Sequence, residues 1–191
     1  MKCALCDSKD CYKGKDCVGL RDEAKKRYVG HDLESMKVST EIEARYYMQK
    51  TRLEELILYA REMKYDKIGV AFCIGLEKEA RIIHKLLEKE FVVHSVCCKV
   101  CGIDKKLFGL KRLHDYEGVE AMCNPIGQAM VLNRAGTKMN VIVGLCIGHD
   151  SLFTKHSEAP VTTLVVKDRV LAHNPLGAIY SGYYQKRLEG V

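Results

Sequence analysis

The sequence predicts an α/β fold, built as a doubly wound and mostly parallel sheet with a small cysteine-rich segment in front of it. Three observations lead to this prediction. The 191 residues are 47% hydrophobic and 29% charged, which is typical of a globular chain that can bury one substantial core. Four short apolar runs have the composition of buried strands, and helical patterns separate them.

The predicted strands cover residues 67–73 (KIGVAFC), 91–97 (FVVHSVC), 139–146 (MNVIVGLC) and 161–167 (VTTLVVK). Unbroken apolar runs rich in β-branched residues are typical of a parallel sheet that is covered on both faces. Helices are predicted over residues 76–90, 125–135 and 175–188. This alternation favours a doubly wound sheet that is Rossmann-like in outline.

The part of the chain before these strands divides into two predicted regions. Residues 1–19 hold four cysteines and little apolar mass, so we expect a metal-binding knot that needs an ion to order it. Residues 20–191 would form the α/β domain. It would begin with a charged connector and a long amphipathic helix over residues 40–64, capped by Ser39 or Thr40.

The N-terminal cysteines follow the pattern C-x2-C-x4-C-x5-C, at Cys3, Cys6, Cys11 and Cys17. Two thiolates separated by two residues can turn toward one ion, and two further thiolates complete a tetrahedral sulfur site. The same four sulfurs could hold an iron–sulfur cluster, although the spacing matches neither common ferredoxin pattern. Zinc and iron–sulfur therefore both remain open, as does a purely structural role for this site.

A second group of cysteines falls near the carboxyl ends of the predicted strands, where ligands bind in open α/β sheets. Cys123 precedes an Asn-Pro pair that is typical of a helix start, and this would place its sulfur at the positive end of a helix. We therefore expect these thiols to converge at one edge of the sheet. The alternative is that each is a small buried hydrophobic residue. The group is Cys73, Cys97, Cys98, Cys101, Cys123 and Cys146.

Three polar residues follow Cys146 closely and are the candidate catalytic residues: His149, Asp150 and Ser151. His149 could carry a proton, act as a ligand or donate a hydrogen bond to a sulfur-bound substrate. Asp150 could orient this histidine or cap the next helix, with Ser151 as a further polar partner.

Other features exclude several classes of protein. The net charge of +6 is spread evenly along the chain, which contains no Trp and four Phe, so we expect no nucleic-acid partner. No apolar run reaches the roughly 20 residues that span a bilayer, and the N-terminus lacks an apolar signal core. We therefore expect a cytoplasmic protein without a membrane partner. Neither a G-x-G-x-x-G nor a P-loop motif occurs, so the sequence gives no support for a dinucleotide-binding or P-loop protein.

The motifs resemble those of a family of small cysteine-rich prokaryotic proteins described as a metal-binding domain of unknown function. The resemblance covers nearly the whole chain. It rests on the N-terminal cysteine pattern, on Cys97-Cys98-x2-Cys101, on Cys123-Asn124-Pro125-Ile126-x-Gln128-Ala129, on the stretch from Gly144 to Phe153 and on residues 159–168. In layout alone, several cysteines at an α/β edge are also similar to iron–sulfur desulfidases, which hold a cluster by three thiolates.

These observations lead to the expectation of an iron–sulfur protein with two sulfur-ligated centres, with 4Fe–4S clusters as the cofactor and zinc as the alternative. The cysteines at the sheet edge would form the working site, for redox or sulfur-transfer chemistry on a small molecule or sulfide, with a redox protein as a partner. Two other functions stay open. One is a zinc-binding scaffold or metal carrier without catalysis, and the other is a thiol enzyme without a cofactor.

Overall fold

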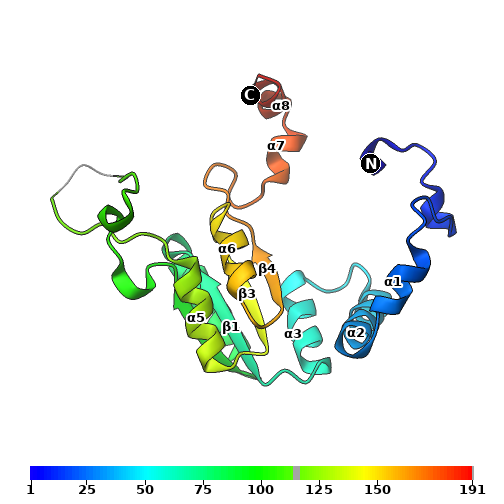
Figure 1. Ribbon diagram of the computed structural model, residues 1–191, viewed down its shortest axis with the longest axis horizontal. Helices are drawn as coiled ribbons and strands as arrows, with labels where there is room; N and C mark the ends of the chain where they lie inside the picture. The colour runs from blue at the N-terminus through cyan, green and yellow to red at the C-terminus, as the bar shows by residue number, and fades with distance from the viewer. Residues whose placement is uncertain (114–116, 191) are drawn as a thin grey trace. The chain divides into compact units, whose positions relative to one another are not determined.

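The computed structural model describes residues 1–113 and 117–190, which divide into two compact units, Met1–Lys50 and Thr51–Val191. The sequence led us to place the boundary after residue 19 instead. Figure 1 shows the elements of both units along the chain. Each unit is described by itself below.

The first unit consists of a loop-rich N-terminal segment and two helices, α1 (Arg21–Arg27) and α2 (Gly30–Tyr46). Two short 3-10 helices, Cys3–Leu5 and Asp10–Lys13, carry two of the four N-terminal cysteines, Cys3 and Cys11. Of the residues in this unit, only Ile42 is buried. The segment from residue 1 to residue 19 contributes no buried side chain, in line with its low apolar content.

The prediction of one long helix over residues 40–64 is wrong. The chain leaves the helical conformation after Tyr46 and starts again in α3 (Arg52–Glu62). Thr51 and Glu54 form a capping box, in which each side chain accepts a hydrogen bond from the other residue's backbone N–H. Such a cap starts a new helix. The Thr-x-x-Glu pattern was visible in the sequence and could have located this break.

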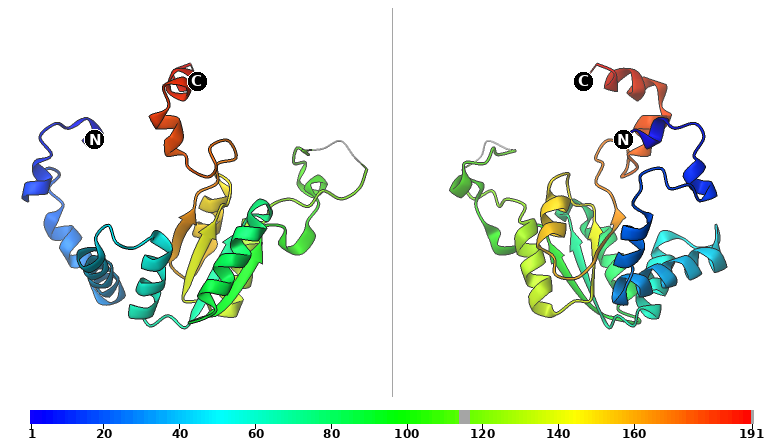
Figure 2. Two further views of the ribbon diagram at one scale, coloured as in Figure 1. Left: turned by 180° about the vertical axis from the view of Figure 1, so that it is seen from behind. Right: turned by 45° about the vertical axis from the view of Figure 1, so that its right-hand side comes forward.

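The second unit is built on a four-stranded parallel sheet, as predicted (Figures 1 and 2). Its strand order, which the sequence did not predict, is β2-β1-β3-β4. The strands are β1 (Lys67–Phe72), β2 (Val92–Cys97), β3 (Met139–Val143) and β4 (Val161–Val165). The chain moves outward in one direction from β1 to β2 and in the other from β3 to β4. The strand order therefore reverses between β1 and β3, which is where ligands bind in folds of this kind.

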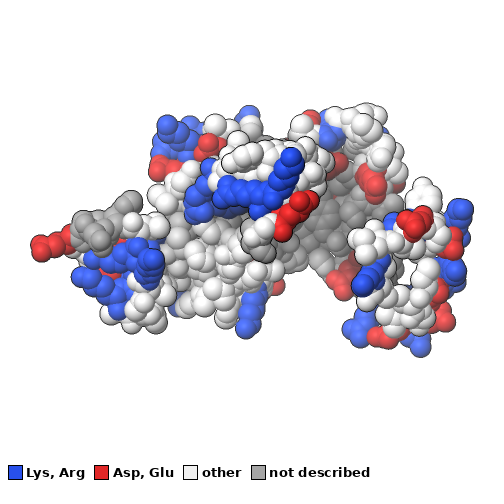
Figure 3. All heavy atoms as spheres, turned by 90° about the horizontal axis from the view of Figure 1, so that it is seen from above, with Lys and Arg blue, Asp and Glu red and all other residues white. Residues whose placement is uncertain are grey.

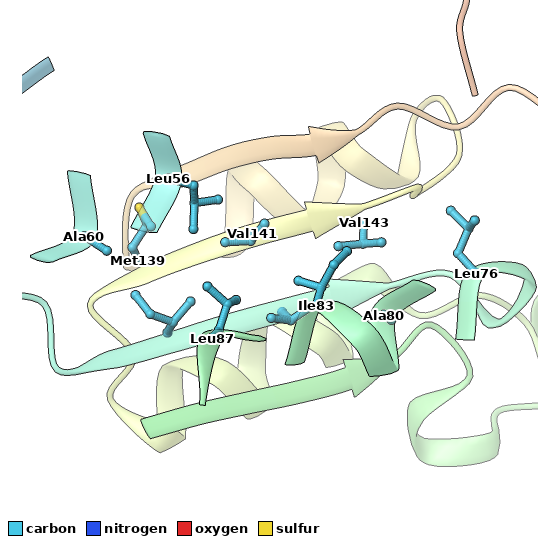
Figure 4. Packing of buried hydrophobic residues seen from close by; sticks show 11 residues of the cluster. Leu56, Ala60, Leu76, Ala80, Ile83, Leu87, Met139, Val141 and Val143 are labelled. Carbon is cyan, nitrogen blue, oxygen red and sulfur yellow. The ribbon is translucent and has the colours of Figure 1, made fainter. Parts of the chain in front are cut away.

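Helices cover both faces of this sheet, which makes the fold doubly wound. On one face, Leu56 and Ala60 of α3 and Ala80, Ile83 and Leu87 of α4 (Glu77–Leu87) pack on alternate residues of β1 and β3 (Figure 4). On the other face, α5 (Pro125–Ala135) and α6 (His149–His156) contribute Ala129, Leu132 and Phe153. This second cluster also contains Cys73 and Cys98, so the strand alternation that builds the core continues into the cysteines.

Two helical predictions differ from the structure in detail. The predicted helix 175–188 is interrupted at Ser181, which separates α7 (Leu176–Tyr180) from α8 (Gly182–Leu188). A 3-10 turn over Ile74–Leu76 precedes α4 and carries the chain away from the end of β1. Across the described residues, no helix combines the length and the apolar character that crossing a membrane requires.

Candidate thiol site at the carboxyl edge of the sheet

Cys98 lies at the centre of the site, between two other cysteines that are distant in sequence. Its side chain is 2% exposed, and its Sγ lies 3.9 Å from Cys123 Sγ. It is also hydrogen-bonded to the side chain of Cys73, which is buried at the end of β1. The backbone N–H of Ile74 donates a further hydrogen bond to Cys98 Sγ at 3.3 Å. Three thiols that the sequence separates by 25 residues each are thus neighbours.

The sheet itself brings the first two of these thiols together. Phe72 pairs with Cys97 in the register of β1 and β2, and the Cys98 N–H donates to the Phe72 carbonyl at 2.9 Å. Cys73 and Cys98 therefore follow directly after the paired ends of two neighbouring strands. Because parallel strands end at the same edge, their next side chains on one face are adjacent.

After Cys98 the chain leaves the sheet, and it returns at Cys123, which brings these two cysteines side by side. Residues 103–105 and 120–122 run alongside each other, with backbone hydrogen bonds from Lys105 N to Glu120 O and from Met122 N to Ile103 O. Where the chain returns, Asn124 N donates to the Cys98 carbonyl at 2.8 Å. Lys99 Nζ also donates to Ala121 O at 2.7 Å. Asn124 then caps α5 by accepting from Gly127 N, so the helix start predicted at Asn-Pro is confirmed.

The proton affinities of the three thiols differ because they share hydrogen bonds. The hydrogen bond with Cys98 lowers the pKa of Cys73 to about 5, against the opposing effect of burial and with help from Lys167. In the same way, Cys98, Lys99 and His149 lower the pKa of Cys123 to about 5. The pKa of Cys98 is raised instead, because its proton is held by the two neighbouring sulfurs and it is buried. These shifts favour the thiolate forms of Cys73 and Cys123 and the protonated form of Cys98.

Cys146 lies at the same edge, three residues after β3, and is held by a different partner. Arg169 Nη2 donates to its Sγ at 3.0 Å. The hydrogen bond with Cys146 raises the pKa of Arg169, and the charges of Cys73 and Cys123 raise it further but more weakly. The fourth thiol therefore belongs to the same electrostatic environment as the other three.

The three candidate catalytic residues begin α6, directly after Cys146. His149 is half-buried, and its charge acts on Cys123. Asp150 accepts a hydrogen bond from the Ser151 N–H at 2.8 Å, which is a local contact at the helix start, and Ser151 is exposed. Of the three, His149 is the residue whose charge reaches a thiol. The catalytic roles of all three remain predictions.

The remaining predicted cysteines of this group have other surroundings. Cys97 lines a cavity of about 440 Å³ beside α4, together with Ser95, Phe72 and charged residues of that helix. Its neighbours in sequence, Val96 and Cys98, belong to the cluster beneath α5 and α6. Cys101 is exposed in a 3-10 turn with a φ of 69°. Cys97 thus lines the cavity beside α4 and also packs against the edge of the other cluster, while Cys101 is exposed, so neither adjoins Cys98 as Cys73 and Cys123 do.

The four N-terminal cysteines are all exposed. Cys6 Sγ lies 3.7 Å from Ser8 Oγ, and Cys17 Sγ lies 3.8 Å from Lys15 O, so their contacts are local. Lys9 Nζ donates hydrogen bonds to the carbonyl oxygens of Cys3 and Cys6, and these hydrogen bonds hold the first turn of the chain together. Within the described ranges 1–113 and 117–190, no three His, Cys, Asp or Glu side chains are grouped as metal ligands. Metal binding by Cys3, Cys6, Cys11 and Cys17 stays a prediction.

Sequence reasoning missed several residues around the thiols. Gln128 is fully buried, and its Nε2 donates to the carbonyl oxygens of Phe72 (3.2 Å) and Val96 (2.7 Å), directly below the strand-end cysteines. Lys99 lies next to Cys98 in the sequence, whereas Lys167 and Arg169 come from the loop after β4. Lys167 lies within the stretch 159–168 quoted for the family resemblance and Arg169 just after it, but no pattern in the sequence ties either to the cysteines, because only the strand order brings that loop to the thiols.

The sulfur positions can be tested against the geometry of a bound ion. Two thiolates on one tetrahedral ion with bonds near 2.3 Å lie about 3.8 Å apart. The separation between Cys98 and Cys123 is 3.9 Å, which fits two ligands of a single ion. Cys73 adjoins the same Cys98 and offers a third sulfur of the same chemical kind. The donors match a thiophilic metal in chemical kind and, for one pair, in separation, while the described residues contain no group of three side chains arranged as a metal site.

Comparison with known proteins gives a family without an assigned activity. Residues 14–164 match the family described as Protein of unknown function (DUF1847). The chain is also 58% identical over 193 residues to the uncharacterized protein MJ0455 of Methanocaldococcus jannaschii, covering 98% of each chain. No solved structure matches the chain. The expected resemblance is thus confirmed, and the chain belongs to the DUF1847 family of proteins of unknown function.

Proposed function

We propose that this protein is a metal-binding protein whose working site is the thiol group at the carboxyl edge of the sheet. Its ligands would be Cys73, Cys98 and Cys123, and its chemistry would be redox or sulfur transfer on a small molecule. The observation that carries this proposal is the position of Cys98, which adjoins two thiols from other segments, one of them at 3.9 Å. Cys73 and Cys98 also pack in the apolar cluster beneath α5 and α6, so small buried hydrophobic residues are the alternative that the test must separate.

Three thiolates are the donor set of a site that leaves one coordination position open. An iron–sulfur cluster held in this way would supply electrons or bind a sulfur atom at an iron without a protein ligand. The 3.9 Å separation favours a second form, a single tetrahedral ion, because the ligands of a cluster bind different irons. Zinc in this form would make the site structural or a metal carrier.

The residues of the chain have distinct roles in this proposal. Cys98, Cys73 and Cys123 bind the metal, and Gln128 fixes the ends of β1 and β2 from which two of these thiols extend. His149 interacts electrostatically with Cys123 and would donate a proton to the substrate or accept one from it. Cys146, held by Arg169, would face the open position.

The test is anaerobic purification of the full chain, followed by metal and acid-labile sulfide analysis and visible spectroscopy. Cys98→Ser and Cys123→Ser should each lose one centre. Cys97→Ser is the matched control, because Cys97 is adjacent in sequence but lines the cavity beside α4. It should keep the metal content of the wild type.

The outcomes separate the alternatives. Iron with stoichiometric sulfide supports a cluster, and metal without sulfide supports the single ion. Equal metal content in the wild type and in Cys98→Ser would place the metal elsewhere. A metal-free protein that reacts through Cys98 or Cys123 would instead support a thiol enzyme without a cofactor.

A further inference from the structure

Positively charged side chains surround the thiol site, and they come from separate segments. Arg169 contacts Cys146 at 3.0 Å. Lys167 lies beside Gly75 and Cys73, since a Cβ at Gly75 would be 3.2 Å from Lys167 Nζ and 3.9 Å from Cys73 Sγ. Lys99 and His149 act on Cys123 from the other side. Cys73, Cys123 and Cys146 thus each have a basic side chain close to them.

Among the described residues, these cations are not held in ion pairs, unlike some other basic side chains. Elsewhere, ion pairs join Arg61 to Glu90 at 2.8 Å and Arg81 to Glu77 at 3.0 Å. Within the part of the chain that the structure describes, no carboxylate pairs with Lys99, Lys167 or Arg169. Figure 3 shows one face of the molecule, on which Lys and Arg lie in several groups, some of them with Asp or Glu beside them.

The loop after β4 is braced so that its acidic residue does not face the cations. Asp168 lies between Lys167 and Arg169, and its Oδ1 accepts hydrogen bonds from Val170 N (2.9 Å) and Leu171 N (2.8 Å). Its backbone N–H donates to His173 Nδ1, and His173 N donates back to the Asp168 carbonyl. The carboxylate is therefore used within the loop, while the two basic side chains extend to Cys73 and Cys146.

The charge of the thiols does not remove this positive potential. If three thiolates bind a divalent ion, most of their charge is neutralised by the ion, and the Lys and Arg charges remain. The Arg169 guanidinium uses one nitrogen on Cys146, and no other acceptor for it occurs among the described residues. A guanidinium has further N–H groups that suit a planar or oxygen-rich anion.

We infer that this edge of the sheet is an anion-binding site, in which Arg169 and Lys167 bind a small anionic substrate beside Cys146. The inference deepens the proposed function by naming the charge class of its substrate. It rests on that function in treating this edge as the working site. Without a metal, the thiolates of Cys73 and Cys123 offset Lys167 and Lys99, and the inference then rests on Arg169. The positive edge would draw the anion in and hold it next to the open position.

The test compares two alkylating reagents that differ in charge, the anion iodoacetate and the neutral iodoacetamide. Both attack the thiolate, so the ratio of their rates at one cysteine cancels changes in the pKa of that thiol. Rates are measured by peptide mass spectrometry on the reduced full chain, as purified and after treatment with a chelator. Cys97 is the internal reference, because its cavity contains two acidic and two basic side chains besides His84 (Glu77, Glu88, Arg81 and Lys85).

We expect the iodoacetate to iodoacetamide ratio at Cys146 to exceed that at Cys97 by about fivefold, and to fall toward it at high salt. Arg169→Gln should lower the ratio at Cys146, and Lys167→Gln should lower it at Cys73 in the chelator-treated chain. Neither change should alter the ratio at Cys97. Equal ratios at Cys146 and Cys97, a ratio unaffected by Arg169→Gln, or a Cys146 that neither reagent reaches would each overturn the inference.

This experiment can fail independently of the metal proposal. A metal-free protein with a high ratio at Cys146 keeps the anion site and removes the metal centre. Stoichiometric metal with equal ratios keeps the metal centre and removes the anion site.

Discussion

At the scale of single residues, the proton on Cys98 decides the chemistry of the site. Cys98 forms hydrogen bonds with two other thiols. The group of three sulfurs is more stable with one proton than with three, because Cys73 and Cys123 are then thiolates with cations beside them. Lys167 neighbours Cys73, while Lys99 and His149 neighbour Cys123. The nucleophilic or metal-binding form of two thiols therefore exists at neutral pH.

This arrangement predicts how the stability of the metal-free chain depends on pH. Because the pKa values of Cys73 and Cys123 are lowered to about 5, the unfolded chain binds more protons than the folded chain between pH 5 and the ordinary thiol pKa. Stability from these groups is complete above the unfolded pKa and is lost as the pH falls through about 5. Urea unfolding at pH about 5.5 and about 8 should show this difference in the wild type, and Cys123→Ser should reduce it.

Gln128 supplies a second prediction at this scale. Its Nε2 donates to two backbone carbonyls at the ends of β1 and β2, and its Oε1 is buried with no hydrogen-bond partner in the described chain. Gln128→Glu would place a carboxylate against those carbonyls and should lower the free energy of unfolding by about 3 kcal/mol. Chemical denaturation measures the change. Gln49→Glu, at an exposed position, should stay within about 0.5 kcal/mol of the wild type.

At the scale of elements, the thiol site depends on how closely β1 and β3 pack against α5. Gly69 of β1 has no room for a side chain, because a Cβ there would clash with Asn140 Oδ1 and lie 2.9 Å from Leu132 Cδ1. Asn140 is itself fixed by Thr137 and Ser157 at 2.8 Å each. The glycine thus allows the helix to lie close enough to the sheet for Cys123 to reach Cys98.

Gly69→Ala should therefore destabilise the second unit by about 2 kcal/mol. Thermal unfolding followed by circular dichroism measures the loss, and thiol alkylation reports whether Cys98 becomes more reactive. Gly182→Ala is the matched control, because a Cβ at Gly182 meets no atom within 4 Å. A Gly69→Ala protein as stable as Gly182→Ala would contradict the close packing described here.

At the scale of the whole molecule, the chain consists of two compact units that each carry cysteines. The thiol site belongs entirely to Thr51–Val191, and the C-x2-C-x4-C-x5-C pattern belongs to Met1–Lys50. Residues 14–164, which match the family, contain all four thiols of the sheet edge but only Cys17 of the N-terminal pattern. The two groups of cysteines are thus expected to act as separate centres.

This separation predicts that Cys6→Ser removes the N-terminal metal and leaves the second unit folded. Amide hydrogen exchange in β1 and β3 should be unchanged, because no side chain of residues 1–19 is buried in the described structure. Cys98→Ser should instead lose the metal of the second unit and keep the metal of the N-terminal unit. Loss of protection in β1 after Cys6→Ser would show that the first residues support the sheet.

The sequence by itself determined the α/β class, the positions of the strands and the helix start at Asn124, because apolar periodicity and capping chemistry are local properties of the chain. It also indicated that the thiols lie at strand ends. The break between α2 and α3 was equally local and was overlooked. Only the tertiary structure decided which thiols meet. The order β2-β1-β3-β4 and the return of the chain to the sheet at Cys123 bring Cys73, Cys98 and Cys123 together. Cys97 instead lines the cavity beside α4. The loop after β4 supplies Arg169. These contacts join residues far apart along the chain, so they follow from the packing of strands and helices and from no local pattern.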